Sequence, residues 1–264
     1  MKTILIIKDT RGASHLVDTL VIAWRRSGYR VVEHFGFSNP PPADLLFLHV
    51  DKTILPEEYL PCTASYQTVI NGRVTDISRR RYSTILLHSE SLHTGPVIVK
   101  TNANYGGIPE FVGTGKESFS WERTSVLDPR SYPIFAGVSN VPPGVWKNPH
   151  LVVEKFIPEF QDGYFYVRYW TFLGEANLTG RIGSRHPIVK FSRCETPDTP
   201  VAIPDRLMIV RKNLGLDYGR FDFVVHGDHF YLLDVNKTQG GVASPDTYRD
   251  QLNFLASGIK SFWQ

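Results

Sequence analysis

The chain has 264 residues, which suits one large domain or two smaller ones with an ample core. Hydrophobic residues make up 42% of it, charged residues 21%, and the net charge is only +3, an ordinary globular balance. The longest basic run, at residues 79–81, is too short to argue for nucleic acid. No apolar run suits a signal peptide or a bilayer-spanning helix, and two cysteines so far apart, Cys62 and Cys194, favour free thiols. We therefore expect a cytoplasmic protein that binds neither nucleic acid nor membrane.

The start of the chain alternates between strand and helix patterns. Apolar runs predict strands at residues 3–8, 29–37, 44–50 and 67–72. Between the first two, Leu16, Leu20, Ala23 and Trp24 share one face of a helix that Gly28 can end. Strand-helix-strand order predicts a parallel α/β layer with right-handed crossovers.

Polar residues follow two of these predicted strands, at residues 8–10 (Lys-Asp-Thr) and 49–51 (His-Val-Asp). Parallel sheets bind ligands at the carboxyl ends of their strands, so these residues are candidates for a binding rim. Solvated loop residues would give the same pattern, and the sequence leaves both interpretations open.

After residue 72 the strand patterns alternate more and glycine and aromatic residues increase. A predicted strand at residues 97–99 ends in Lys100 and is followed by Gly106 and Gly107. A lysine beside a glycine-rich turn can hold phosphate, because glycine lets backbone N–H groups approach the anion. A plain turn with a solvated lysine is the alternative.

Two further strand patterns carry charges among apolar residues. In "LVVEKFI", Glu154 and Lys155 interrupt an apolar run. This pattern indicates either an edge strand whose charges protect it against aggregation, or a segment whose free backbone N–H and C=O groups bind the edge of an adenine. In "YFYVRYWTF", Arg168 must reach solvent or meet an anion.

The stretch "FDFVVHGDHFYLLDVNKTQG" predicts a hairpin with one aspartate in each strand, Asp222 and Asp234. A three-residue loop, 227–229, would set the two carboxylates directly opposite each other, whereas a two-residue loop would put them on opposite faces. Opposed carboxylates repel unless a cation lies between them. Asn236 adds a third oxygen donor, and this set suits Mg²⁺. A solvated hairpin with chance acidic residues is the alternative.

Taken in order, these segments resemble the ATP-grasp superfamily, in particular its carboxylate–amine ligases such as the ribosomal-protein glutamate ligases and the D-alanine–D-alanine ligases. The resemblance covers most of residues 65–264. It implies an α/β (α+β) protein with an N-terminal parallel α/β layer over residues 1–72 and a two-lobed ATP-grasp domain over 73–264. The first lobe would span about 73–150 and the second about 151–264.

The resemblance also implies the cofactors, ATP and Mg²⁺, and the site. Lys100 and Arg81, with Arg79 and Arg80 as alternatives to Arg81, would contact the phosphates. The other implied contacts are Glu154, Lys155 and Ile157 at the adenine, Glu159 at the ribose, Arg168 with Arg181 or Lys190 at the γ-phosphate, and Asp222, Asp234 and Asn236 at the metal. Arg220 would stabilise the tetrahedral intermediate, and Asp234 stands where the family more often has glutamate.

The implied reaction activates a carboxylate as an acyl phosphate, which an amine then attacks to form an amide or peptide bond. The substrates would be small-molecule or peptide carboxylates and amines, and relatives allow for a homodimer. Two alternatives stay open: a small-molecule kinase on the same fold, and an ATP-binding regulator without turnover.

Overall fold

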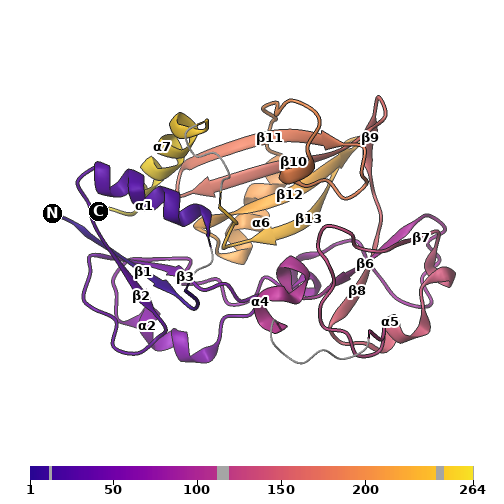
Figure 1. Ribbon diagram of the computed structural model, residues 1–264, viewed down its shortest axis with the longest axis horizontal. Coiled ribbons are helices and arrows are strands. Elements are labelled where there is room, and N and C mark those ends of the chain that lie inside the picture. The colour runs from indigo at the N-terminus through magenta and orange to yellow at the C-terminus, as the bar shows by residue number, and fades with distance from the viewer. Residues whose placement is uncertain (12–13, 112–118, 242–246, 264) are drawn as a thin grey trace.

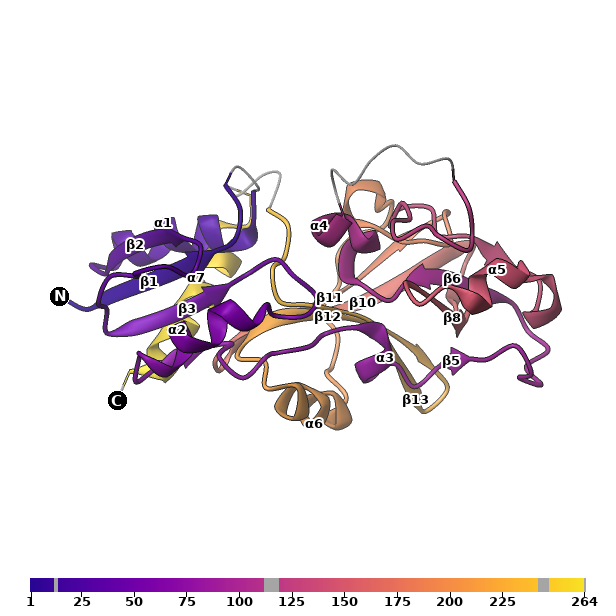
Figure 2. The ribbon, with the colours of Figure 1, turned by 90° about the horizontal axis from the view of Figure 1, so that it is seen from below.

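The computed structural model describes residues 1–11, 14–111, 119–241 and 247–263. Their strands form three sheets, which lie one after another along the long axis of the molecule (Figure 1). The N-terminal layer lies at one end, the four-stranded sheet of the first lobe at the other, and the second lobe's sheet spans the space between them (Figure 2).

The N-terminal layer is a parallel sheet in the order β2-β1-β3-β4. Its elements are β1 (Thr3–Lys8), α1 (Leu16–Arg26), β2 (Arg30–Phe35), β3 (Leu45–His49), η1 (Glu57–Tyr59), α2 (Leu60–Ala64) and β4 (Val69–Ile70). The predicted helical face of α1 is buried, and Gly28 follows the helix with a φ of +85°. The predicted parallel α/β layer is therefore confirmed.

The first lobe contains an antiparallel sheet in the order β5-β8-β6-β7. Its elements are α3 (Arg79–Tyr82), β5 (Leu86–Leu87), β6 (Val97–Thr101), η2 (Asn104–Gly107), α4 (Ile108–Phe111), β7 (Ile134–Phe135), η3 (Val138–Asn140), α5 (Pro143–Lys147) and β8 (Leu151–Lys155). Valines and isoleucines of β6 and β8 supply much of its core.

The second lobe is built on the antiparallel order β11-β10-β12-β13, with β9 paired to β10. Its elements are β9 (Glu159–Gln161), β10 (Tyr164–Leu173), β11 (Ala176–Ser184), η4 (Phe191–Arg193), α6 (Asp205–Leu214), β12 (Tyr218–His226) and β13 (His229–Asn236). Helix α6 covers one face of this sheet, where Trp170, Phe172 and Phe221 pack with Leu207.

The last helices, α7 (Arg249–Ser257) and η5 (Gly258–Phe262), return to the N-terminal layer. Leu252, Leu255 and Ile259 join the same core as the buried residues of α1 and β1. The indole N–H of Trp24 in α1 donates to the carbonyl of Ala256 at 2.9 Å. Both ends of the chain therefore contribute to one core, and α1 and α7 lie side by side (Figure 1).

Strand β8 pairs with β5 and β6, so it belongs to the sheet of the first lobe. Residues 156–158 connect β8 to β9, which pairs with β10 in the sheet of the second lobe. The division of the chain into domains stays a prediction. Within the described ranges, no helix has the length and apolar character needed to cross a membrane.

Candidate functional site

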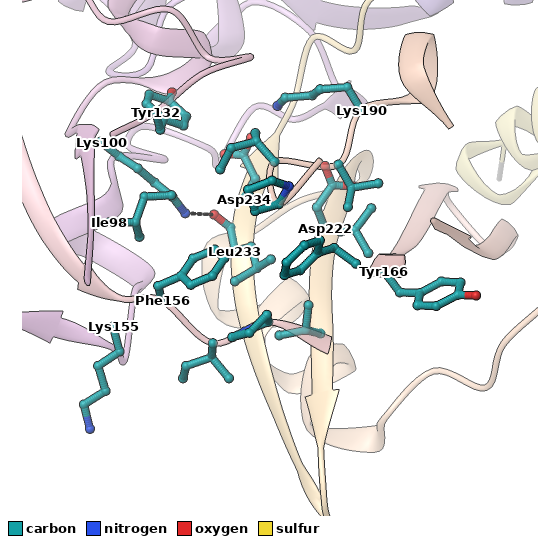
Figure 3. Close-up of a pocket in the computed structure, with 18 of the residues that line it drawn as sticks. Ile98, Lys100, Tyr132, Lys155, Phe156, Tyr166, Lys190, Asp222, Leu233 and Asp234 are labelled. Carbon is teal, nitrogen blue, oxygen red and sulfur yellow. Dashed lines mark hydrogen bonds between the residues drawn. The ribbon is translucent and has the colours of Figure 1, made fainter. Parts of the chain in front are cut away.

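A cavity lies between the sheets of the two lobes (Figure 3). One wall comes from β6 and the 155–158 connection, and the other from β10, β12 and β13. Its polar lining residues are Arg79, Lys100, Tyr132, Lys155, Tyr166, Lys190, Asp222 and Asp234. Its apolar lining residues include Ile98, Phe156, Ile157, Ile188, Val224 and Leu233. The cavity thus has one apolar part and one charged part, as an amphipathic ligand requires.

Lys100 lies at the charged end, held near the carboxyl terminus of β6. Its amine is 2.8 Å from Oε2 of Glu154 on the neighbouring strand β8 and donates to the carbonyl of Leu233 at 3.3 Å (Figure 3). Burial lowers the pKa of Lys100, although Glu154 opposes the shift. Burial alone would raise the pKa of Glu154, but the charges of Lys100 and Arg79 and the hydrogen bonds to the carboxylate together lower it. We infer that this pair is ionised, with the lysine poised over the cavity.

The hairpin of β12 and β13 sets Asp222 directly opposite Asp234, as expected. The expected loop is wrong, because His226 pairs with His229 and the turn has two residues. A β-bulge restores the register: Phe223 pairs with Leu232 and Asp222 with Asp234, so Leu233 is the extra residue. The bulge frees the carbonyl of Leu233 to accept hydrogen bonds from Lys100 and Arg79.

Each aspartate is held by one arginine through one carboxylate oxygen. Arg79 Nη2 lies 3.1 Å from Asp234 Oδ1, and Arg220 Nε lies 2.6 Å from Asp222 Oδ1. The two cations reduce the repulsion between the opposed carboxylates. The second oxygen of each carboxylate makes no hydrogen bond within the described part of the chain, so each aspartate retains a donor atom for a ligand.

Asn236 completes the donor set on the same hairpin. It pairs with Arg220 across the ladder, two residues from Asp234, and its Oδ1 accepts the backbone N–H of Thr238 at 2.8 Å. No group of three His, Cys, Asp or Glu side chains among the described residues could hold a metal by itself. Two carboxylates and an amide oxygen nevertheless fit Mg²⁺, which takes its remaining ligands from water and phosphate.

Arg79, and not Arg81, occupies the basic position of the 79–81 run at the cavity. The Arg79 side chain is buried and donates to the carbonyls of Thr101 and Leu233 as well as to Asp234. Arg80 donates to backbone carbonyls outside the cavity, and Arg81 is exposed. The helical turn of α3 explains why only one of these arginines reaches the cavity, since three successive side chains on a helix point in three directions.

Solved structures share the backbone fold of this protein over nearly the whole chain. A RiPP-associated ATP-grasp ligase from Chryseobacterium gregarium, in complex with ADP and a leader and core peptide, matches with a TM-score of 0.58 and 11% identity over 98% of this chain and 97% of that one. The macrocyclase MdnC from Microcystis aeruginosa, bound with the precursor peptide MdnA, gives 0.55 and 13% over 97% and 98%. A RimK domain ATP-grasp protein from Sphaerobacter thermophilus gives 0.53 and 12% over 97% and 99%.

The chain has the ATP-grasp fold. No protein-family model and no curated protein matches the sequence. At 11 to 13% identity the likeness to those structures lies in the backbone. The cavity described above lies between the two lobes of this fold.

The apolar end of the cavity lies beside the connection between the lobes. The side chain of Lys155 points away from the cavity in Figure 3, so this segment lines it mainly with backbone and with Phe156 and Ile157. The backbone N–H groups of Lys155 and Phe156 donate to carbonyls of the first lobe. Within the described residues, the N–H of Ile157 makes no hydrogen bond and is left for a ligand.

Three residues that were expected to contact the nucleotide do not line this cavity: Glu159, Arg168 and Arg181. Glu159 accepts hydrogen bonds from Arg168 and, at 2.7 Å, from Arg181. Arg168 pairs with Arg181 and with Phe223, so these side chains lie on the face that carries α6 and not on the aspartate face. Alternation along β10 is the reason, because Arg168 is one residue away from Tyr169, the partner of Asp222. The expected ribose contact of Glu159 and phosphate contacts of Arg168 and Arg181 are corrected accordingly.

Lys190 does line the cavity, from the segment that follows β11. Figure 3 shows its side chain extending toward the first lobe, where Tyr132 and Lys100 lie. Sequence reasoning missed Tyr132 and the bulge at Leu233. The apolar run around Leu233 contains nothing that marks an extra residue, and Tyr132 lies in a loop without a motif.

Proposed function

We propose that this protein is an ATP- and Mg²⁺-dependent carboxylate–amine ligase that forms an amide or peptide bond through an acyl phosphate. One observation carries the proposal: Lys100 and the opposed Asp222 and Asp234 line a single cavity between the two lobes. The peptides and ADP named in the complexes of the structural neighbours support peptide carboxylates or amines as substrates.

The adenine would lie at the apolar end of the cavity, against Ile98 and Ile188, with its edge toward the N–H of Ile157. The phosphates would then reach Lys100 and Lys190. Lysine suits this task because a compact ammonium binds phosphate oxygens without a fixed geometry. Glu154 would hold the amine of Lys100 in place while the nucleotide enters.

Asp222, Asp234 and Asn236 would hold Mg²⁺, which when bound neutralises charge on the phosphates during transfer. Arg220 lies beside this set, over the rings of Tyr169 and Phe191 at 4.6 Å from each. Its fixed guanidinium would stabilise the oxyanion that forms when the amine attacks the acyl phosphate. The two lobes would exclude water, which would otherwise hydrolyse that intermediate.

The test is incubation of the protein with ATP, Mg²⁺ and pooled carboxylic acids and amines, followed by mass spectrometry. We expect ADP, phosphate and a new amide, with turnover at least about a hundredfold lower in Lys100→Met. Arg81→Ala, an exposed change in the same lobe, serves as the control. A stable phosphoester would indicate the kinase instead, and tight ATP binding without substrate-dependent ADP would indicate the regulator.

The remaining expectations concern the surroundings of the enzyme. We propose a cytoplasmic location and a homodimer, without nucleic-acid or membrane partners. Light scattering of the purified chain would measure the oligomeric state directly.

A further inference from the structure

A second group of polar side chains lies outside the nucleotide cavity, where the N-terminal layer meets the other lobes. We call Asp9, Asp51, Glu110, Lys237 and Gln239 the rim cluster. Asp9 and Asp51 follow β1 and β3, Glu110 lies in α4, and Lys237 and Gln239 follow β13. Figure 2 shows the segment after β13 running between the N-terminal layer and α4.

Hydrogen bonds join members of the rim cluster to one another and to neighbouring residues. The backbone N–H of Asp51 donates to Asp9 Oδ1 at 2.8 Å, and the hydroxyl of Thr238 donates to Asp51. Glu110 Oε1 accepts the backbone N–H of Thr53 at 2.5 Å. These bonds fix one oxygen each of Asp9 and Glu110 and tie the segment after β13 to the N-terminal layer.

Of the remaining polar atoms, Asp51 Oδ2 lies 3.6 Å from His15 Nε2 and Gln239 Oε1 accepts from the Thr171 hydroxyl at 3.2 Å, but several others have no partner. Oδ2 of Asp9, Oε2 of Glu110 and Nε2 of Gln239 are buried without a hydrogen bond. Lys237 is only 4% exposed, and its amine makes no hydrogen bond or ion pair with the described residues. A buried polar atom without a partner destabilises the folded chain, so several close together indicate an absent ligand.

The charges of the rim cluster do not balance. The ammonium of Lys237 interacts electrostatically with four carboxylates, those of Asp51, Asp9, Glu110 and Asp76. The neighbouring lysines are engaged elsewhere, since Lys8 binds Asp18 and Glu33, and Lys52 binds the carbonyl of Pro109.

His49, which lies beside Asp51, adds no charge, because burial lowers its pKa to about 3. The excess of negative charge favours a cation. The described carboxylates do not converge as metal ligands do, which favours an organic ammonium group over a metal ion.

We propose that the rim cluster binds the amine substrate, its ammonium group on Asp9 and Glu110 and its own carboxylate or carbonyl oxygen on Lys237. This proposal rests on the proposed ligase activity. A ligand with both groups is an amino acid or the amino terminus of a peptide. Lys237 directly follows Asn236, so this ligand would lie beside the metal-binding face, where the acyl phosphate forms.

The first test needs no ligand. Asp9→Asn and Glu110→Gln keep the bonded oxygen and replace the unpaired one by a neutral amide. We expect a thermal midpoint equal to that of the wild type or higher by about 2–4 °C, because each change removes an uncompensated buried charge. Asp228→Asn, an exposed change of the same type in the β12–β13 turn, is the control. A midpoint lowered by more than this in both variants would mean that the carboxylates are structural, and would overturn the proposal.

The second test measures binding by calorimetry with the full chain and a non-hydrolysable ATP analogue. The probes are the twenty common amino acids, matched dipeptides, acetate and methylammonium. We expect amino acids or dipeptides to bind the wild type at least tenfold more tightly than Asp9→Asn, Glu110→Gln or Lys237→Met, with acetate not binding. Binding of amino acids alone would identify a free substrate, and binding of dipeptides alone a peptide terminus.

If no probe binds, or if all variants bind the probes equally, the proposal fails. The affinity for the ATP analogue is recorded in the same titrations, and we expect the rim variants to change it less than twofold. Loss of analogue binding in the wild type would instead contradict the proposed function, so the two failures are distinguishable.

Discussion

At the scale of single residues, Arg79 organises the candidate site by binding protein and not ligand. Arg79 uses its guanidinium on two backbone carbonyls, Asp234 and the hydroxyl of Tyr82. A guanidinium whose N–H groups are occupied in this way has few free donors with which to bind a phosphate. We therefore regard it as the group that orients Asp234 and joins β6 to β13.

This role predicts the behaviour of Arg79→Met. Without the guanidinium, Asp234 loses its orienting partner, and the affinity for Mn²⁺, a paramagnetic substitute for Mg²⁺, should fall about tenfold or more. Stability should fall by about 3–5 kcal/mol, because a buried ion pair is broken on one side. Electron paramagnetic resonance measures the metal affinity and urea unfolding the stability.

Arg81→Ala, two residues along the same helical turn, should leave both values unchanged. Arg79→Lys should recover part of the stability, since it restores the charge without the full set of donors. Equal metal affinity in Arg79→Met and the wild type would contradict the orienting role.

At the scale of elements, the decisive feature is the bulge in β13. The spacing of Asp222 and Asp234 favours a hairpin metal site, and the opposed pair expected from it is present. The loop that sequence reasoning required is not, because the extra residue is Leu233 in the strand and not His229 in the turn. Leu232 and Leu233 are identical in type, so the sequence could not indicate which one leaves the ladder.

The sequence also does not show which strands pair, and this explains the other differences between the expected and the observed site. Arg168 lies amid aromatic residues that suit either face of a sheet, and only the pairing with Phe223 decides its side. The strands of the N-terminal layer were predictable, because apolar runs between polar loops leave few alternatives. Residues brought together from distant segments, such as Lys100 with Glu154, lie side by side only in the folded chain.

Deleting Leu233 tests the bulge. The hairpin would then keep its two-residue turn and the Asp222–Asp234 pair in unbroken register, but it would lose the Leu233 carbonyl that accepts hydrogen bonds from Arg79 and Lys100. We expect Mn²⁺ binding to weaken about tenfold or more, because these two side chains no longer hold the strand that carries Asp234. Leu233→Ala is the matched control, since it retains the backbone carbonyl and the bulge. Equal Mn²⁺ affinity in the deletion and the alanine variant would show that the bulge does not set the site, and circular dichroism would verify that both are folded.

At the scale of the whole molecule, the two ends of the chain share one core. Leu255 of α7 is fully buried and belongs to the cluster that contains Ile4, Leu20 and Phe47 of the N-terminal layer. The layer that resembles a separate domain in sequence therefore depends on residues from the far end of the chain. Sequence patterns could not predict this packing, because the apolar face of an amphipathic helix does not indicate which part of the protein it packs against.

We predict that Leu255→Ala lowers the free energy of unfolding by about 3 kcal/mol, the usual cost of a large cavity in a core. Phe254→Ala, which removes a half-exposed neighbour, should change it by less than about 1 kcal/mol. Fluorescence of Trp24, which contacts α7, would follow the transition. A similar loss in both variants would mean that α7 does not pack as described.

The return of α7 also governs the order of events during synthesis. A ribosome releases the N-terminal layer before it has translated α7, the helix that closes the core of this layer. Until then, α1 exposes the apolar surface that α7 later covers, and such surface is prone to aggregation. We expect the nascent layer to acquire its final protection against proteases only after α7 has left the ribosome.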